Sequence, residues 1–386
     1  MSALALAALA LLTHGGAIAD PWGRPLATDF SSFWTAGKLA LAGTPELAWD
    51  PAAHAAAQRD SFAAASGYAA NYYAFFYPPP FLLICLPLGL LPYGAAVTAW
   101  LTLTAVAYVA VIRGLLPPKW PAILAALAFP AFLANAEHGQ NGALSTALIG
   151  AAALQLDRRP GLAGACLGAL CVKPQLALLV LPMLVAARRW QALAWTVAVA
   201  LTLCGGSLLV VGEAGWRSFF ANAALAQATL EDGLVGFGKI ASAFAALRLL
   251  GAPSAAAWLG QGAASLAALI VAAGVAWRRP GAAAEGAALA AAACLATPFL
   301  LDYDLMVLAV PMAWVAARGE QSGYWPWEKL VLAGAFALPL VARSLAAQVG
   351  LPLAPLVVAA LFWVVARRAL GAPAGAVRPL RHIPTP

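Results

Sequence analysis

Asp29 is the first residue of this sequence whose position suggests chemistry. It follows an apolar stretch, residues 3–19, and begins an amphipathic segment, residues 29–43. A carboxylate there could act as a general base, because it can accept the proton of a hydroxyl group held beside it. Aspartate is also a common helix N-cap, so Asp29 could instead serve only to start a helix.

A polar cluster with the sequence Glu-His-Gly-Gln-Asn interrupts two apolar stretches at residues 137–141. Its side chains exceed the hydrogen-bonding capacity that a tight turn needs. His138, Gln140 and Asn141 are therefore candidates for substrate binding, and amide groups suit sugar hydroxyls because they both donate and accept hydrogen bonds. The alternative is a plain turn to which the neighbouring glycines give backbone freedom.

Two lysines could bind an anion. Lys173 and Gln175 flank a proline between two short apolar segments, away from the basic pairs at the ends of neighbouring stretches. A lipid phosphate entering between short helices would satisfy Lys173, and the alternatives are a snorkelling side chain or a structural pair with an acidic residue. Lys239 could meet the same phosphate, or it could be a solvated loop lysine.

Asp302 and Asp304 form the last candidate group. Paired carboxylates could bind a metal ion, orient a sugar or assist a base, and they could also simply cap helices. We assign no residue as a metal ligand. The sequence lacks His-Glu-x-x-His, Gly-x-Ser-x-Gly and a Walker phosphate loop, so a metalloprotease, a serine hydrolase and an ATP-driven pump lose their usual support.

The composition indicates that helices in a lipid bilayer position these residues. Of 386 residues, 63% are hydrophobic and 10% are charged, and the mean hydropathy is +0.84. A water-soluble chain could not bury so much apolar surface. The five cysteines lie in apolar runs and do not form a disulfide framework. The basic residues behind the net charge of +7 occur as isolated pairs, so no nucleic acid partner is expected.

We expect an all-α polytopic membrane protein with about twelve transmembrane helices, at roughly 20 apolar residues per span. Residues 81–91 are too short to cross and could re-enter the membrane. The first span could alternatively be a signal peptide cleaved after residue 19. The expected helices are 3–19, 93–112, 120–135, 141–156, 161–172, 174–187, 190–211, 253–276, 284–300, 304–318, 329–346 and 352–368.

Lysine and arginine concentrate in cytoplasmic loops, which assigns the helix ends to faces. Residues 20–78 and 212–250 become the first and second extracytoplasmic loops of one transmembrane catalytic domain, residues 1–370, and residues 371–386 form a short cytoplasmic tail. Two amphipathic helices are expected in the first loop, over residues 29–43 and from residue 51 to about 66. Every polar cluster then faces the outer side.

Several blocks of the sequence, in order over roughly residues 20–320, resemble glycosyltransferase family 87, a group of bacterial polytopic enzymes of the GT-C class. The resemblance implies a catalytic acidic residue in the first outer loop, here Asp29, and a sugar donor carried on polyprenyl phosphate. The family includes mannosyltransferases, which implies a hexose such as mannose. The blocks are Asp29-Phe30 with Phe33-Trp34, residues 42–45, Tyr77-Pro78-Pro79, His138-Gly139-Gln140-Asn141, Lys173-Pro174-Gln175 and Thr297-Pro298 with Asp302-Tyr303-Asp304.

We therefore expect a glycosyltransferase of the bacterial inner membrane that builds cell-envelope glycans. It would move a sugar from a polyprenyl-phosphate donor to an extracytoplasmic glycan or glycolipid by one inverting displacement, without a metal or cofactor. Asp29 would be the base, and Lys173 and Lys239 would hold the leaving phosphate. A lipid or solute transporter or flippase is the alternative. The expected substrate-binding residues are Tyr77, His138, Gln140, Asn141, Gln175, Asp302 and Asp304.

Overall fold

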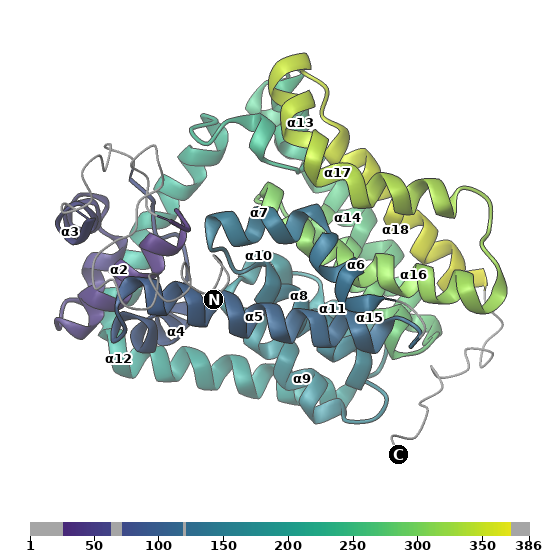
Figure 1. Cartoon of the computed structure of the whole chain (residues 1–386), viewed down its shortest axis with the longest axis horizontal. Helices are drawn as coiled ribbons and strands as arrows, with labels where there is room; N and C mark the ends of the chain where they lie inside the picture. The colour runs from purple at the N-terminus through teal and green to yellow at the C-terminus, as the bar shows by residue number, and fades with distance from the viewer. Residues whose placement is uncertain (1–25, 63–71, 119–120, 372–386) are drawn as a thin grey trace, which may run out of the picture.

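The computed structural model describes residues 26–62, 72–118 and 121–371, and these residues form helices joined by short turns (Figure 1). No β-strand occurs among them; one isolated antiparallel bridge joins Ile240 and Leu301. The prediction of an all-α protein is confirmed for this part of the chain.

The α-helices follow the expected order. Four short 3-10 helices interrupt them: η1 (Pro45–Trp49), η2 (Leu170–Val172), η3 (Phe237–Lys239) and η4 (Asp302–Leu308). The α-helices are α2 (Phe30–Leu41), α3 (Pro51–Phe62), α4 (Pro79–Gly89), α5 (Tyr93–Leu115), α6 (Ala122–Ala128), α7 (Pro130–His138), α8 (Gly142–Gln155), α9 (Pro160–Ala169), α10 (Pro174–Ala177), α11 (Val180–Ala186), α12 (Trp190–Glu231), α13 (Ala243–Leu249), α14 (Ser254–Arg278), α15 (Ala282–Ala296), α16 (Ala309–Ser322), α17 (Glu328–Val349) and α18 (Leu353–Gly371).

Five of the described helices, α5, α12, α14, α17 and α18, are long and apolar enough to cross a membrane. Shorter apolar helices of 10–17 residues lie between them in the chain. These helices agree with a membrane protein. The count of about twelve spans stays a prediction, and its first member, residues 3–19, lies outside the described residues.

Three expected helices are interrupted in the structure. Residues 174–187 are divided into α10 and α11, and the other two differ as follows. The span predicted at 120–135 is broken into α6 and α7, because Phe129 is extended (φ −64°, ψ 119°) and Pro130 begins α7. Proline disfavours helical geometry in the residue before it and supplies no backbone N–H. The span predicted at 304–318 begins as the 3-10 helix η4, and the α-helix starts only at Ala309.

The chain continues as a helix where the second outer loop was predicted. Gly212 has φ 63° and ψ −176° inside α12, a conformation that favours glycine. The helix resumes after Gly212 and ends at Glu231. The sequence therefore located the break correctly at 212, but the helical structure of residues 213–231 was not predicted.

Helix α2, which begins directly after Asp29, packs very closely on α4. A Cβ atom added to Gly37 would lie 2.2 Å from the carbonyl oxygen of Cys85, and one added to Gly89 would lie 2.8 Å from the carbonyl carbon of Gly37. Only glycine on both helices permits this approach. The contact fixes the position of α2, and therefore of Asp29.

An aromatic cluster packs around the same buried face of α2, between α2, α4 and α5. The Phe33 ring centroid lies 4.8 Å from that of Phe81 and 6.1 Å from that of Trp100, and Phe30 packs 5.8 Å from Tyr93. Phe30, Phe33 and Phe81 are fully buried. Edge-to-face packing of this kind stabilises a fixed arrangement of the rings. The predicted apolar face of residues 29–43 is thus a core face.

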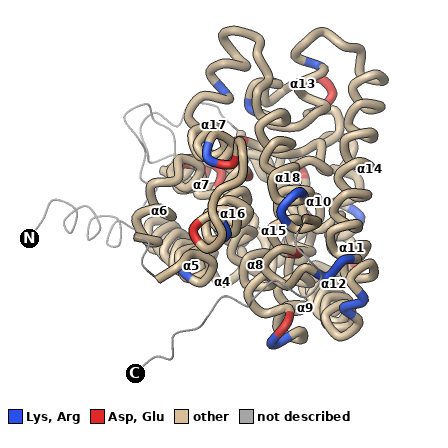
Figure 2. The backbone as a smooth tube through the Cα atoms, turned by 90° about the vertical axis from the view of Figure 1, so that its right-hand side faces the viewer, with Lys and Arg blue, Asp and Glu red and all other residues tan. Residues whose placement is uncertain are grey.

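Basic pairs at three helix ends meet at one end of the molecule. Arg189 forms ion pairs with Asp157 at 2.6 Å and with Glu285 at 2.8 Å, and Arg188 lies 4.3 Å from the ring centroid of Trp277. Figure 2 shows lysine and arginine residues near the ends of α9, α11 and α12. Helix α8 links this end to the polar turn at 138–141 and is about 21 Å long at 1.5 Å per residue.

We predict that Gly37→Ala destabilises the protein, because the added methyl group must push α2 away from α4. Overpacking of this kind costs about 1–3 kcal/mol. Thermal unfolding of the purified protein in detergent should show a lower Tm. The control is Gly334→Ala on α17, where an added Cβ meets nothing within 4 Å. Equal Tm values for the two variants would contradict the tight crossing.

Candidate active site

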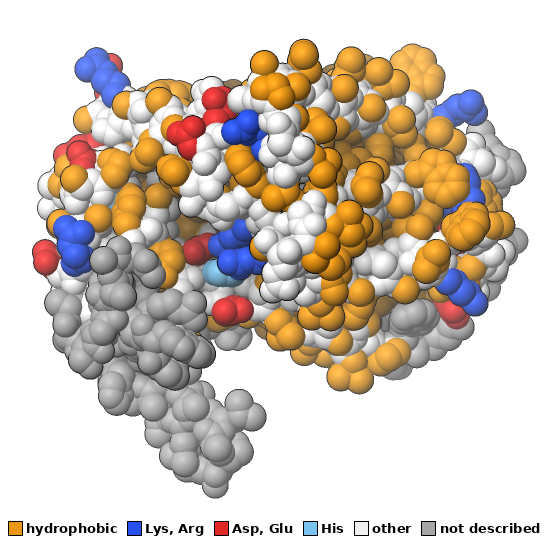
Figure 3. Space-filling model, turned by 90° about the horizontal axis from the view of Figure 1, so that it is seen from above, with side chains coloured by type: hydrophobic (Ala, Val, Ile, Leu, Met, Phe, Trp, Pro, Cys, Tyr) orange, Lys and Arg blue, Asp and Glu red, His pale blue; other side chains and the backbone are white. Residues whose placement is uncertain are grey.

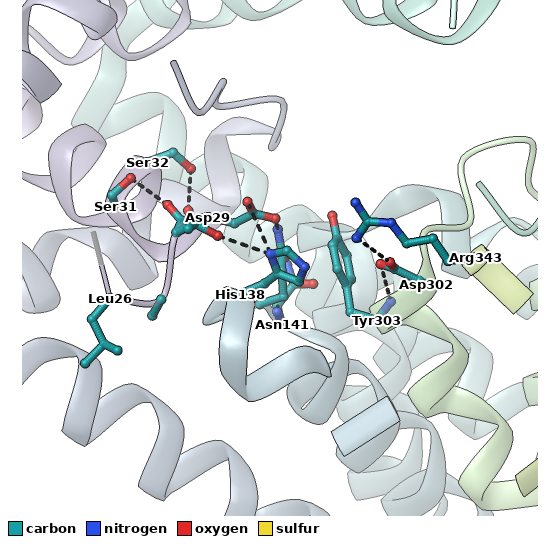
Figure 4. Close-up of polar contacts among 12 residues, drawn as sticks. Leu26, Asp29, Ser31, Ser32, His138, Asn141, Asp302, Tyr303 and Arg343 are labelled. Carbon is teal, nitrogen blue, oxygen red and sulfur yellow. Dashed lines mark hydrogen bonds and ion pairs between the residues drawn. The ribbon is translucent and has the colours of Figure 1, made fainter. Parts of the chain in front are cut away.

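Asp29 occupies the N-cap position of α2, but its side chain makes no capping hydrogen bond. Instead its Oδ2 atom accepts a hydrogen bond of 2.8 Å from Nε2 of Gln140, and its Oδ1 atom lies 3.9 Å from Nδ1 of His138 (Figure 4). The Asp29 side chain is 17% exposed. The Asp29 carboxylate therefore does not cap α2, the alternative role that the sequence left open.

The backbone brings Asp29 and the turn at 138–141 together. The Asp29 amide donates a 3.0 Å hydrogen bond to the carbonyl of His138. Gly139 has φ 66°, and a Cβ atom there would lie 2.6 Å from Cβ of Phe30. Glycine is thus required both by the left-handed conformation and by the close approach of α2.

Gln140 orients the Asp29 carboxylate. Its Oε1 atom accepts hydrogen bonds from the Tyr77 hydroxyl at 2.8 Å and from the Asn141 amide at 3.2 Å, which leaves its NH₂ group to donate to Asp29. Burial raises the pKa of Tyr77 well above its usual value, and the Asp304 and Asp29 carboxylates raise it further. Tyr77 therefore remains a hydroxyl donor at physiological pH.

His138 lies between Asp29 and Tyr303. Thr28 Oγ1 is 3.1 Å from its Nδ1 atom, and its ring centroid is 5.7 Å from that of Tyr303. Burial lowers the pKa of His138 below 6.5, opposed by the Asp29 carboxylate. The imidazole is consequently neutral at neutral pH and can exchange hydrogen bonds with a polar substrate.

Lys173 lies beneath this site and is 1% exposed. Its ammonium group donates a 2.6 Å hydrogen bond to Oδ1 of Asn141 and a very short one to Oδ1 of Asp304. Asp304 Oδ2 also accepts the Leu301 amide at 3.2 Å. The structure thus contains the structural pair that the sequence left open as an alternative for Lys173. The structure does not test the predicted contact between Lys173 and a donor phosphate.

Two further cations border the site. The Lys239 ammonium lies 5.7 Å from the Tyr303 ring centroid, and Arg343 Nη1 lies 3.5 Å from Oδ2 of Asp302. Burial raises the pKa of Tyr303 well above its usual value, and so do the neighbouring Tyr77 and Asp29. Figure 3 views the molecule from above and shows a histidine side chain with acidic and basic side chains around it on the visible surface.

A family model for glycosyltransferase family 87 matches residues 75–301. The chain belongs to glycosyltransferase family 87. No curated protein and no solved structure matches the chain. The matched region includes His138, Gln140, Lys173 and Lys239. Asp29 lies outside the matched region, next to Gln140 and His138.

Most residues predicted for the site of this family 87 enzyme lie together, but Gln175 does not. Gln175 lies in the short helix α10, two residues after Lys173. In the described part of the chain, no polar contact joins its side chain to the other candidate residues. Among the described residues, no group of three or more His, Cys, Asp or Glu residues could hold a metal ion.

Sequence reasoning missed Thr28, Tyr303 and Arg343. Arg343 had a detectable signal, since it is an isolated arginine in the apolar stretch 329–346, and charges in such stretches are costly. Tyr303 lies between the two predicted aspartates and was not named as a site residue. Its ring contacts became visible only when α7, η3 and η4 were placed together.

We predict that Asp29→Asn lowers the rate of sugar transfer by about 100- to 10,000-fold, the range for loss of a general base. The amide retains the size of the side chain and can still accept the Gln140 hydrogen bond, so the Tm should stay unchanged. Asp50→Asn is the matched control, because Asp50 accepts the Ala53 amide at 2.8 Å as a helix cap. Near-normal transfer by Asp29→Asn would exclude Asp29 as the base.

We predict that Lys173→Met lowers stability by about 3–5 kcal/mol, because it leaves Asp304 buried and uncompensated. The double variant Lys173→Met with Asp304→Leu removes both charges and should recover much of the Tm. The decisive measurement is the donor KM of the double variant. A normal KM is expected for a structural pair, whereas a stable double variant with a strongly raised donor KM would make Lys173 a phosphate ligand.

Proposed function

We propose that this family 87 glycosyltransferase transfers a hexose such as mannose from a polyprenyl-phosphate donor to a glycan or glycolipid acceptor. The observation that carries the proposal is the Asp29 carboxylate, which Gln140 holds by one oxygen. The other oxygen lies 3.9 Å from Nδ1 of His138. The His138 ring neighbours Tyr303, and Tyr303 lies beside the Lys239 ammonium. A base beside a cation suits attack by a hydroxyl group on a sugar whose leaving group is a phosphate.

The chemistry is a single displacement. Oδ1 of Asp29 accepts the proton of the acceptor hydroxyl while its oxygen bonds to the anomeric carbon of the donor sugar. The bond from this carbon to the phosphate oxygen breaks, and its electrons leave with the phosphate. The transition state resembles an oxocarbenium ion, and attack opposite the leaving group inverts the anomeric configuration. A phosphate leaves without a general acid, so one carboxylate is sufficient.

Lys239 and Arg343 are the proposed ligands of the donor phosphate. Both lie beside the Tyr303–Asp302 segment, and Asp302 holds the Arg343 guanidinium at 3.5 Å. Lysine serves as a point charge for phosphate, whereas arginine can donate two parallel hydrogen bonds to it. Lys173 is already paired with Asp304, so its proposed part is to support Tyr303, whose ring centroid is 5.6 Å from its ammonium.

We propose that the site opens on the extracytoplasmic face of the bacterial inner membrane. The support is the separation between the site and the basic pairs, because such pairs mark the cytoplasmic side. Helix α8 has the site at its start and Asp157, which pairs with Arg189, just after its end. At this far end Arg189 is held by Asp157 and Glu285 in a local ion-pair cluster, which favours an enzyme over a transporter with a polar path to both faces.

The proposal is tested with the purified protein in lipid nanodiscs, a hexosyl polyprenyl phosphate and glycolipid acceptors from a bacterial membrane. Transfer of the labelled hexose is expected. Lys239→Gln and Arg343→Gln should each raise the donor KM by about 10-fold, the effect of losing a hydrogen bond to a charged group. Arg217→Gln is the control, since Arg217 pairs with Glu213 on the exposed face of α12.

Two results would contradict the proposed function. The first is transfer from a nucleotide sugar while hexosyl polyprenyl phosphates remain untouched. The second is movement of a lipid or solute across the membrane without any transfer of sugar, which would support the transporter alternative.

A further inference from the structure

An apolar groove with a volume of about 370 Å³ lies beside the candidate active site, and the mechanism above does not use it. It runs between the second half of α12 and the first turns of α14, and two phenylalanines from other segments line it as well. The lining residues that matter here are Phe76, Ala223, Ala226, Leu230, Trp258 and Phe299.

Three segments at the groove lead directly to residues of the candidate site. Phe76 directly precedes Tyr77, and Phe299 lies three residues before Asp302. Leu230 packs in one core cluster with Ile240, the residue after Lys239. The groove therefore lies next to the residues that supply the proposed phosphate ligand Lys239.

The chemistry of the groove suits a hydrocarbon chain. Its walls are mostly aromatic rings and small or branched aliphatic side chains. Of the two amide side chains in its lining, that of Gln227 already donates a 2.8 Å hydrogen bond to Glu231. A sugar or nucleotide in the groove would therefore find few hydrogen-bonding partners. Burying apolar surface contributes about 25 cal/mol of favourable free energy per Å². Only an apolar ligand in this groove would gain that free energy on binding.

We infer that this groove binds the isoprenoid chain of the donor, next to the phosphate held by Lys239. The inference rests on the proposed function and deepens it by assigning the lipid part of the substrate. A cationic group beside an apolar groove matches an amphiphile with an anionic head and a hydrocarbon tail. The groove takes the isoprene units nearest the phosphate, and the remainder of the chain stays in the bilayer.

The test compares two donors that carry the same hexose, one on a long polyprenyl phosphate and one on a phosphate with a short alkyl chain. Ala226→Trp and Ala223→Trp each place an indole in the groove. Each should raise the KM for the long-chain donor by about 10-fold and leave the KM for the short-chain donor within twofold. Ala224→Trp is the matched control, because Ala224 is an exposed residue on α12 outside the lining.

Every outcome decides the inference. Equal effects on both donors, or none on either, would overturn it, provided that the Tm shows a folded protein. If the tryptophan variants unfold, Ala226→Leu fills the groove with a smaller side chain and makes the same comparison. A raised KM for a glycolipid acceptor alone would assign the groove to that lipid and overturn the inference. Failure of the wild-type protein to use any prenyl-phosphate donor would instead overturn the proposed function, and this inference with it.

Discussion

The buried contact among Lys173, Asp304 and Asn141 is the interaction on which the candidate site depends. It joins three places where helices are interrupted: the turn after α7, the break before α10 and the 3-10 helix η4. A charge at this depth is tolerated only when it is paired and hydrogen-bonded. The Lys173–Asp304 pair therefore fixes the relative positions of three irregular segments. The position of the 138–141 turn, and of the Asp29 carboxylate bonded to it, depends on this contact.

The interruptions themselves supply the chemistry. A continuous apolar helix satisfies all its backbone groups and presents few polar side chains, whereas a break leaves backbone groups that need partners. Pro130 and Gly139 delimit α7, and the carbonyl of His138 at its end accepts the Asp29 amide. The same turn presents Gln140 to the Asp29 carboxylate. The candidate site is thus built from the positions where the apolar helices are interrupted.

Polar and apolar features lie side by side. On one side are the Asp29 carboxylate, proposed as the base, its amide partner Gln140 and two cations, and on the other is the groove between α12 and α14. An amphiphilic donor needs both surfaces in contact, since its phosphate requires cations and its chain requires an apolar lining. The segment around Ile240 and Leu301, which forms an antiparallel bridge, links the two regions.

The amino-acid sequence by itself determined the class of fold and most helix boundaries, and it named most of the polar residues that the structure brings together around Asp29. Apolar composition and basic pairs identified the membrane helices, and the polar clusters stood out because charges and amides are rare in such a chain. His138, Gln140 and Asp29 could be named in this way, since each breaks an apolar pattern or begins an amphipathic one.

Only the tertiary structure decided which partner each polar group has. Asp29 could have capped α2, and Lys173 could have been free for a phosphate, because local sequence does not show what lies more than a hundred residues away. Tyr303 and Arg343 became part of the site only when η4, α7 and α17 packed together. Long-range contacts of this kind depend on the packing of whole helices, and hydropathy or local spacing does not encode that packing residue by residue.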